Sequence, residues 1–480
     1  MDGNQKKRML FGSISVASVV ILLTGSMISS FFIDNSSYNP PKEVNIIEWD
    51  IVVPDDYPTL YDAIESAVSG QSIFVRSGIY YLDKGLINNP ITFNKPDISI
   101  CGEDKNNTII DGRRLATVVY INADNVSFQG FTFKNNGING SLLRVFSSNN
   151  IIKNNNFLIY DFQDGIEYGV KFNNANNNLF SFNHVYGGEY GIDIGSSHNN
   201  IFSYNLIENN EVAVDVDPIY TIDSSRRITE KIYRDPCTNN QFISNIIRNN
   251  NVGLTIAGSS NNTIFNNSFI SNNLRGLILS KCSNFVIRNN GFISDSLDIR
   301  GSELVHFVHI VENNLVNGKH IFYTYNQDDF GVPIGVGQII LVDCSYVDLE
   351  NIIISNTSTA VLLAFCDYVY VENCVFSYNI YGIYLYFSTY CSIERNNFIR
   401  NRRNVNFISL GIRNVKKNKF RQNYWEGSLL SRIRLFKISP QGISGRFYLR
   451  RPLKESGRSR IPFIITVFDW RPARKPYDIY

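Results

Sequence analysis

The sequence predicts an all-β chain that winds as a single-stranded right-handed parallel β-helix, a solenoid of coils about 22 residues long. Its 480 residues are 44% hydrophobic and 18% charged, with a net charge of +2, which excludes a disordered chain and a polytopic membrane protein. Asparagine supplies 61 residues, and because it is a poor helix former that favours turns, a helical fold is disfavoured. The strongest observation is a repeat.

The repeat is an apolar residue with asparagine three positions later and another apolar residue five positions later. It recurs, mostly at steps of 22 or 23 residues, at Ile152, Phe180, Phe202, Phe242, Ile264, Ile287, Leu349, Val371, Ile393 and Val415, with Ile352 and Cys374 in place of the asparagine in two of the ten copies. Short strands between Asn, Gly and Ser turns then stack as coils at ~4.8 Å, with the apolar residues inside. We expect each recurring asparagine to adopt the left-handed conformation at a bend and to bond the asparagine one coil above, so that Asn245 and Asn267 touch.

The chain is expected to begin with a signal peptide or signal anchor over residues 1–33. Lys6, Lys7 and Arg8 precede an uncharged run of 25 residues, Met9–Ile33. The apolar core of a signal peptide spans ~7–15 residues and a membrane-spanning helix needs ~20, so this run is long enough to remain in the membrane. Small residues at 23–26 keep cleavage open as the alternative. Either way, we expect an extracytoplasmic, cell-surface protein.

The remaining elements follow in chain order. Residues 34–49 are expected to be a linker and residues 50–423 the β-helix. Thr59 is a candidate N-cap for a short capping helix that Gly70 ends, with apolar residues at helical spacing between them. Residues 424–480 contain no asparagine and carry twelve Lys or Arg against four acids, a charge of +8. This segment is expected to be a basic C-terminal cap or appendage, solvated or in contact with an anionic surface.

The seven cysteines show neither a disulfide framework nor a metal-binding pattern. No C-x-x-C pair occurs, and an odd number in an exported chain leaves at least one thiol unpaired. We expect them to be small buried apolar residues. Cys344 and Cys366, one period apart, are expected to lie in register on adjacent coils.

Several segments resemble NosD-like and pectate-lyase-like right-handed β-helix proteins, in particular archaeal cell-surface proteins of that kind. They are Asp56–Ile64, Gly70–Val75, Gly78–Tyr80, Ile100–Gly112, Val316–Lys319, Gly337–Val342 and Phe468–Asp478. The resemblance covers roughly residues 50–480. It implies the fold but no single activity, since such proteins range from lyases and hydrolases to surface proteins without known activity.

Carboxylates recur at one position of the repeat. Asp193 and Asp215 each lie thirteen positions after a frame residue, between apolar neighbours that point inward. Both carboxylates are therefore expected to face solvent on adjacent coils. Lys171 takes the corresponding position one coil earlier, and Asp217 follows Asp215 on the same face.

This group of charges suits work on a glycan. Two close carboxylates raise one pKa or recruit a divalent cation such as Ca²⁺, and paired carboxylates cleave glycosides. The insertion 218–236 directly follows, and its Arg226 and Arg227 are expected to help form a cleft wall suited to an anionic sugar. Tyr384 takes the position of Asp193 on a later coil and is a candidate for stacking on a sugar ring.

Two functions from different classes remain open. The first is a non-catalytic surface protein without a cofactor that binds glycans or other envelope components. The second is a polysaccharide lyase, hydrolase or epimerase that uses Asp193 and Asp215, with Ca²⁺ as the candidate cofactor. A NosD-like copper accessory function is a minor alternative, because three Met and five His are few for copper ligands. The membrane is an expected partner through the N-terminal segment, and nucleic acid is not.

Overall fold

The structure is a computed structural model. It describes residues 48–82, 90–115, 117–160, 166–222, 231–410, 414, 417–426, 441–450, 460–469, 472–473 and 475–479. All of them belong to one compact unit, Ile46–Tyr480. The predicted membrane segment Met9–Ile33 lies outside the described residues. Among the residues that are described, no helix is long and apolar enough to span a membrane.

One short helix, α2 (Leu60–Ser66), lies where the sequence predicted it. The Thr59 hydroxyl accepts the backbone N–H of Asp62 at 3.0 Å, so that an otherwise unpaired donor of the first turn is satisfied. Leu60, Ala63 and Ile64 are buried and join the hydrophobic core, which places the apolar side of the helix against the first strands.

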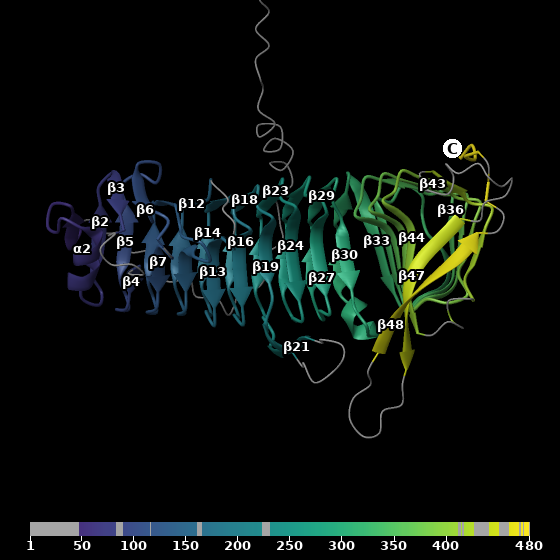
Figure 1. Cartoon of the computed structure of the whole chain (residues 1–480), viewed down its shortest axis with the longest axis horizontal. Coiled ribbons are helices and arrows are strands. Elements are labelled where there is room, and N and C mark those ends of the chain that lie inside the picture. The colour runs from purple at the N-terminus through teal and green to yellow at the C-terminus, as the bar shows by residue number, and fades with distance from the viewer. Residues whose placement is uncertain are drawn as a thin grey trace, which may run out of the picture. The chain divides into compact units, whose positions relative to one another are not determined.

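Short parallel strands then build a first solenoid of three sheets, with coils stacked in chain order (Figure 1). Sheet A contains β1 (Ile51–Val53), β2 (Ser72–Val75), β5 (Ser99–Gly102), β8 (Ser127–Gln129), β11 (Ile151–Lys153), β14 (Leu179–Ser181), β17 (Ile201–Ser203), β22 (Gln241–Ile243), β25 (Thr263–Phe265), β28 (Val286–Arg288) and β31 (Ile310–Glu312).

The other two sheets complete each coil of this solenoid. Sheet B contains β3 (Gly78–Tyr81), β6 (Thr108–Asp111), β9 (Thr132–Lys134), β12 (Asn156–Leu158), β15 (His184–Tyr186), β18 (Leu206–Glu208), β23 (Ile246–Arg248), β26 (Ser268–Ile270), β29 (Gly291–Ile293) and β32 (Leu315–Val316). Sheet C contains β4 (Ile91–Phe93), β7 (Val119–Ile121), β10 (Ser141–Val145), β13 (Tyr168–Asn173), β16 (Tyr190–Gly195), β19 (Val212–Val216), β24 (Val252–Ala257), β27 (Arg275–Ser280) and β30 (Leu297–Arg300).

The predicted asparagine ladder is confirmed in the first solenoid. Each side-chain amide donates to the amide oxygen of the next asparagine at 2.9 to 3.3 Å, along Asn155, Asn183, Asn205, Asn245, Asn267, Asn290 and Asn314. The expected backbone conformation was wrong by one position: the residue before each ladder asparagine is left-handed, as at Asn154, Asn266 and Asn289. The ladder residue itself uses its side chain to join the coils above and below.

The apolar column of the repeat fills the interior as predicted. Phe157, Val185, Ile207, Ile247, Phe269 and Phe292 are all buried, and neighbouring rings stack on one another, for example Phe269 and Phe292 at 4.9 Å. Because each ring covers the next, removal of one residue would expose faces on two coils.

The chain reverses at Asn317 and Gly318, which the sequence did not predict. Both residues have positive φ, and β32 pairs antiparallel with β33 (Lys319–Tyr325) across this two-residue turn. Asn-Gly is the sequence that such a turn requires. The β-helix of residues 50–423 is therefore interrupted here and consists of two solenoids. One core cluster lies within the second solenoid, and the cluster of the first solenoid also includes residues of the second.

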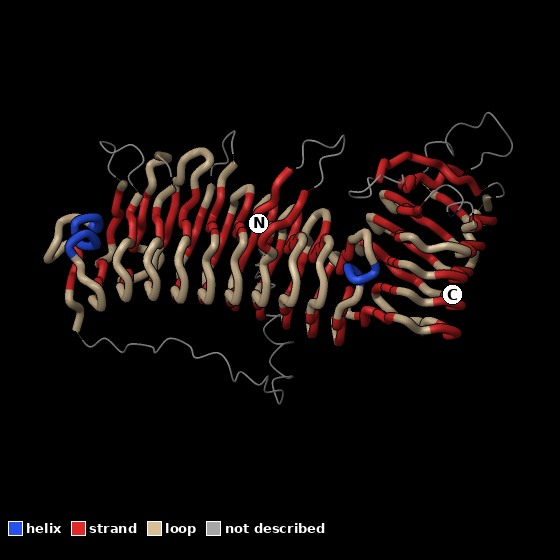
Figure 2. The backbone as a smooth tube through the Cα atoms, turned by 90° about the horizontal axis from the view of Figure 1, so that it is seen from below, coloured by secondary structure: helices blue, strands red, loops and turns tan. Residues whose placement is uncertain are grey.

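The second solenoid again has three sheets, and loops alternate with strands in each coil (Figure 2). Sheet D contains β33, β35 (Gln338–Val342), β38 (Thr359–Ala364), β41 (Tyr381–Tyr386) and β44 (Arg403–Leu410), then β47 (Gln441–Arg450) and β48 (Arg460–Asp469). Sheet E contains β34 (Asp328–Gly331), β36 (Ser345–Glu350), β39 (Asp367–Glu372), β42 (Ser392–Glu394) and β45 (Lys419–Arg421). Sheet F contains β37 (Ile353–Ser355), β40 (Val375–Ser377), β43 (Asn397–Ile399) and β46 (Tyr424–Trp425).

Strands β35 and β38 of sheet D are buried on both faces. Ile339, Leu341 and Leu363 fill the core of the second solenoid, whereas Ile340 and Leu362 join the core cluster of the first. Gln338 fixes this contact, because its side chain donates to the carbonyl oxygens of Leu297 at 2.6 Å and Thr359 at 2.9 Å. The two solenoids therefore meet at strands β35 and β38, which are covered on both faces.

Candidate functional site

The predicted charged column lies on the outer face of sheet C. Lys171, Asp193 and Asp215 are register partners on three successive coils, β13, β16 and β19. Their neighbours Ile192, Ile194 and Val214 are buried, so the charged residues point outward as predicted. Gly191 allows this close stacking, because a Cβ there would lie 2.6 Å from the carbonyl oxygen of Ala213.

Lys171 connects the charges to a pair of aromatic rings. Its ammonium lies 2.5 Å from a carboxylate oxygen of Asp193 and 3.7 Å from the ring centroid of Tyr168. Tyr168 stacks on Tyr190 with centroids 5.3 Å apart. Burial and then the charge of Asp193 raise the pKa of Tyr168 to about 12, so its hydroxyl keeps its proton and remains a hydrogen-bond donor.

The column continues toward the N-terminus with further basic and aromatic residues. Arg144 is the register partner of Lys171, and Tyr120 is the partner of Arg144. Tyr120 stacks on Phe146 with centroids 5.8 Å apart. From β7 to β19 this register column therefore reads Tyr, Arg, Lys, Asp, Asp, and the stacked pair Tyr168 and Tyr190 lies in a neighbouring column.

The insertion after β19 leaves this face as an antiparallel hairpin, β20 (Ile219–Ile222) and β21 (Lys231–Asp235). Asp217 lies at its start, where its backbone N–H bonds the carbonyl of Ile194. The candidate cleft residues Arg226 and Arg227 lie outside the described residues. The hairpin therefore begins beside Asp215, as the spacing predicted.

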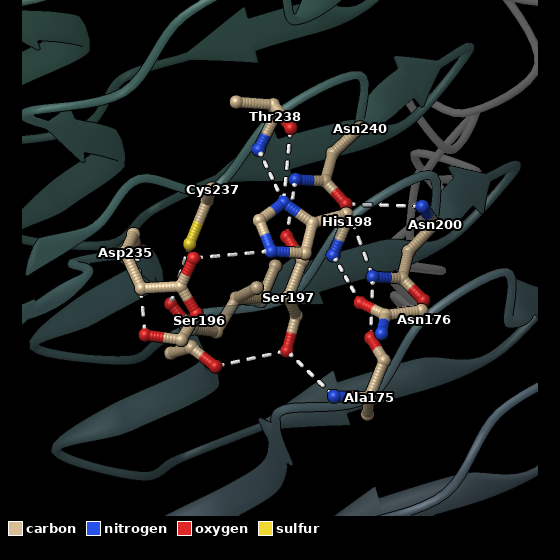
Figure 3. Close-up of polar contacts among 12 residues, drawn as sticks. Ala175, Asn176, Ser196, Ser197, His198, Asn200, Asp235, Cys237, Thr238 and Asn240 are labelled. Carbon is tan, nitrogen blue, oxygen red and sulfur yellow. Dashed lines mark hydrogen bonds and ion pairs between the residues drawn. The ribbon is translucent and has the colours of Figure 1, made fainter.

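A second polar cluster, shown in Figure 3, lies at the base of this hairpin and was not predicted. Nδ1 of His198 lies 2.9 Å from the Thr238 hydroxyl, and Nε2 lies 3.4 Å from an Asp235 carboxylate oxygen. The His198 backbone N–H bonds the side chain of Asn176 one coil earlier. The 40-residue step between His198 and Thr238 hid this contact, since the insertion separates residues that are neighbours in the stack.

Tyr384 does not lie on an open surface, and the prediction that it stacks on a sugar is wrong. Only 9% of it is exposed, and its ring stacks on Tyr386 with centroids 4.4 Å apart. It lies on the face of sheet D that joins the core of the first solenoid. Asp193 and Tyr384 occupy the same position of the repeat. This position faces outward at Asp193 but is covered at Tyr384, because the chain reversal brings the two solenoids together.

The last coil of sheet C carries a buried ion cluster that the sequence did not reveal. Asp298 extends the same outward column, since it pairs with Ile278, yet only 1% of it is exposed. One of its oxygens bonds Arg275 at 2.6 Å and Arg300 at 2.7 Å. Burial alone would raise the pKa of Asp298, but the two guanidinium groups hold it below its ordinary value.

The described residues do not fit a copper ion. They contain no group of three or more His, Cys, Asp or Glu side chains that could hold a metal. All seven cysteines are free thiols, and each except Cys101 is buried. Cys344 and Cys366 lie on adjacent coils as predicted. Cys344 connects β35 to β36, Cys366 connects β38 to β39, and these strands pair in register. Their sulfurs bond backbone carbonyls.

Comparisons with known proteins agree with the observed fold. Residues 168–330 match the model of the periplasmic copper-binding protein family NosD, and residues 333–434 match the right-handed β-helix region family. No curated protein matches the sequence. Similar solved structures include the A-module of Azotobacter vinelandii mannuronan C-5 epimerase AlgE6, at 12% identity and a TM-score of 0.43. The alignment covers 75% of this chain and 91% of that one.

Two further solved structures are similar at the same low level. The family 28 exopolygalacturonase of Yersinia enterocolitica has 11% identity and a TM-score of 0.38, over 75% of this chain and 74% of that chain. The N-terminal fragment of bacteriophage phi29 gene product 12 has 15% identity and a TM-score of 0.38, over 76% and 62%.

Proposed function

We propose that this NosD-like right-handed parallel β-helix repeat protein acts outside the cytoplasm and binds a polysaccharide along the outer face of sheet C. The proposal rests on one observation: charged side chains lie in one register column on four successive coils, and the stacked rings of Tyr168 and Tyr190 lie in the column beside it. The half-buried rings of Tyr168 and Tyr190 offer apolar surface to sugar C–H groups, and the neighbouring charges offer hydrogen bonds to hydroxyls or carboxylates. Side chains that repeat from coil to coil suit a polymer whose sugar units also repeat.

The proposed location rests on the N-terminal sequence, in which three basic residues precede the uncharged run Met9–Ile33. That run is long enough to anchor the chain, with the β-helix outside. Added protease should degrade the β-helix in intact spheroplasts while a cytoplasmic marker survives. Protection of the β-helix until the membrane is lysed would contradict this location.

The tyrosine pair is expected to carry much of the binding. In the double variant Tyr168→Ala, Tyr190→Ala we expect about a tenfold loss of affinity for a polysaccharide identified on a glycan array, since each lost aromatic contact is worth ~0.5–1.5 kcal/mol. The matched control is Phe182→Ala, Tyr204→Ala, which removes a second stacked pair, itself exposed and with centroids 4.9 Å apart, at the turns between sheets A and B. Equal losses of affinity in the two double variants would contradict the proposal that polysaccharide binds to the outer face of sheet C.

A catalytic role is the second candidate, and the register of Asp193 and Asp215 favours it. Adjacent strands lie ~4.8 Å apart, close to the ~5 Å between the carboxylates of retaining glycosidases. Lys171 forms an ion pair with Asp193, which suits an ionised base or nucleophile rather than an acid. The corresponding activities are those of a lyase, hydrolase or epimerase, with Ca²⁺ as the candidate cofactor.

Product analysis separates binding from catalysis. We expect the protein to bind polysaccharide without shortening or epimerising it, with or without calcium. Turnover that falls at least a hundredfold in the double variant Asp193→Ala, Asp215→Ala would instead establish the catalytic role. Turnover that survives this change would place the chemistry at another site.

A further inference from the structure

A small pocket lies where the two solenoids meet. It has a volume of about 160 Å³, and its lining comes from turns of both solenoids, including Asn273 and Ser294 of the first and Asn356, Thr357, Ser358 and Tyr378 of the second. No acidic or basic side chain lines it. Pockets for drug-sized ligands measure ~300–1,000 Å³, so this one has room for a single small ring.

The pocket is held in a fixed shape. The Asn317 side chain accepts the backbone N–H of Ser294 at 2.9 Å and donates to the carbonyls of Ser355 and Asn356, each at 3.1 Å. The Thr357 hydroxyl and N–H both bond Asn379. Because these contacts already join both walls, a ligand would bind without the entropic cost of ordering them.

Three polar side chains at the pocket are available to a ligand. Across the residues that the structure describes, the side chains of Asn273, Ser294 and Asn356 make no hydrogen bond, and all three residues are exposed. Amides and hydroxyls both donate and accept. They therefore match sugar hydroxyls, which do the same, better than they match a charged group.

Tyr378 offers a ring face on the pocket side. It follows Asn356 by one coil and precedes Arg400 by one coil, and all three residues are left-handed. The guanidinium of Arg400 lies 5.7 Å from the ring centroid and donates to the Tyr378 hydroxyl at 3.0 Å, which fixes the ring and covers one face. Tyr378 is 53% exposed.

Elsewhere, the equivalent space is filled by another ring. Tyr346, Tyr368 and Tyr390 are also left-handed and lie on successive coils, and their rings stack with centroids 4.9 and 4.8 Å apart. Asn356 stands where such a column would place the ring before Tyr378. The pocket thus lies on the side of Tyr378 where Asn356, and not another ring, occupies the preceding coil.

We propose that this junction pocket binds one uncharged sugar unit, which stacks on Tyr378 and bonds the polar groups of both solenoids through its hydroxyls. The site differs from the charged face of sheet C, and neither depends on the other. One neutral unit at a junction suits a chain end or a side branch of a glycan.

The test uses the full chain in a detergent without a sugar headgroup. Saturation-transfer NMR with methyl glucoside, methyl galactoside and methyl mannoside should show transfer to at least one of them, and weaker transfer to glucuronate. Tyr378→Ala should weaken the affinity at least tenfold. Asn356→Tyr, which fills the pocket with a ring that this backbone accepts at Tyr346, should abolish binding while the melting temperature is kept.

The matched control is Tyr346→Ala, which removes an equally exposed, left-handed tyrosine outside the pocket. It should leave the affinity unchanged. The proposal is overturned if none of the three neutral glycosides binds, if glucuronate binds best, or if Tyr346→Ala weakens binding as much as Tyr378→Ala. Loss of polysaccharide binding in the Tyr168 and Tyr190 variant leaves the pocket result intact, so the two proposals fail separately.

Discussion

Replacement of Asp298 by alanine is expected to lower the free energy of unfolding by about 3 kcal/mol or more, because it leaves two cations without their buried partner. Asp298 is 1% exposed, and Arg275 and Arg300 both bond the same carboxylate oxygen. The side chains of Arg275 and Arg300 are only 16% and 33% exposed, so water replaces the lost carboxylate incompletely.

The contacts between the two solenoids make this site unable to relax. Arg275 lies 5.8 Å from the ring centroid of Tyr381, which Arg403 approaches at 5.9 Å. Tyr384 and Tyr386 are buried beside Asp298, and burial raises the pKa of both hydroxyls. An unpaired arginine here faces rings and neutral hydroxyls rather than another acid.

Urea denaturation followed by circular dichroism would measure this loss. The control is Glu312→Ala, which breaks an ion pair of 2.9 Å between Glu312 and Arg288. The two side chains are 54% and 43% exposed, so this change should lower the free energy of unfolding by less than about 1 kcal/mol. The triple change Asp298→Leu, Arg275→Met, Arg300→Met should recover most of the stability, since apolar groups of similar size can replace a buried ion pair. If Asp298→Ala costs no more than Glu312→Ala, the cluster does not hold the junction.

The repeat made the fold predictable because its period is local. An apolar residue, an asparagine and a second apolar residue within six positions determine which side chains point inward, and the stacking of coils follows from that pattern. The reversal at Asn317 and Gly318 was missed because a two-residue turn leaves the period intact on both sides. The 62-residue step from Ile287 to Leu349 and the Asn-Gly pair itself were its traces in the sequence.

The candidate site was predictable to the same extent. Lys171, Asp193 and Asp215 lie together because one register relates them. Tyr384 occupies the corresponding frame position, but its surroundings depend on how the two solenoids pack, and a repeat carries no information about that. The signal available was composition: residues 339–342 and 360–364 are continuous apolar runs, as strands covered on both faces require.

Asp295 shows how a ladder of asparagines ends, and its burial makes one contribution to stability depend on pH. A further ladder runs from Asn210 through Asn250 to Asn272, whose backbone and side-chain N–H groups both donate to one oxygen of Asp295. The other oxygen is buried and has no partner among the described residues. Burial raises the pKa of Asp295 to about 7 from an ordinary value of 3.8, against the effect of the Asn272 hydrogen bonds.

Asp295→Asn is therefore expected to stabilise the protein at alkaline pH and to change little in acid. Because the pKa of Asp295 is higher in the folded than in the unfolded state, the contribution of Asp295 to stability falls as pH rises from about 4 to 7, by up to about 4 kcal/mol, and this loss persists above pH 7. An asparagine at position 295 carries no charge. We expect its amide to donate to a carbonyl of the preceding coil, as the amide of Asn272 donates to the carbonyl of Ile247.

Urea midpoints at pH 4.5 and pH 8 would test this difference. We expect the free energy of unfolding of the variant to exceed that of the wild type by about 2–4 kcal/mol at pH 8 and by less than about 1 kcal/mol at pH 4.5. The control Asp348→Asn removes an exposed carboxylate, so its effect should be small at both pH values. A gain of equal size at both pH values would mean that the introduced amide improves the ladder sterically, and that ionisation of Asp295 does not limit stability.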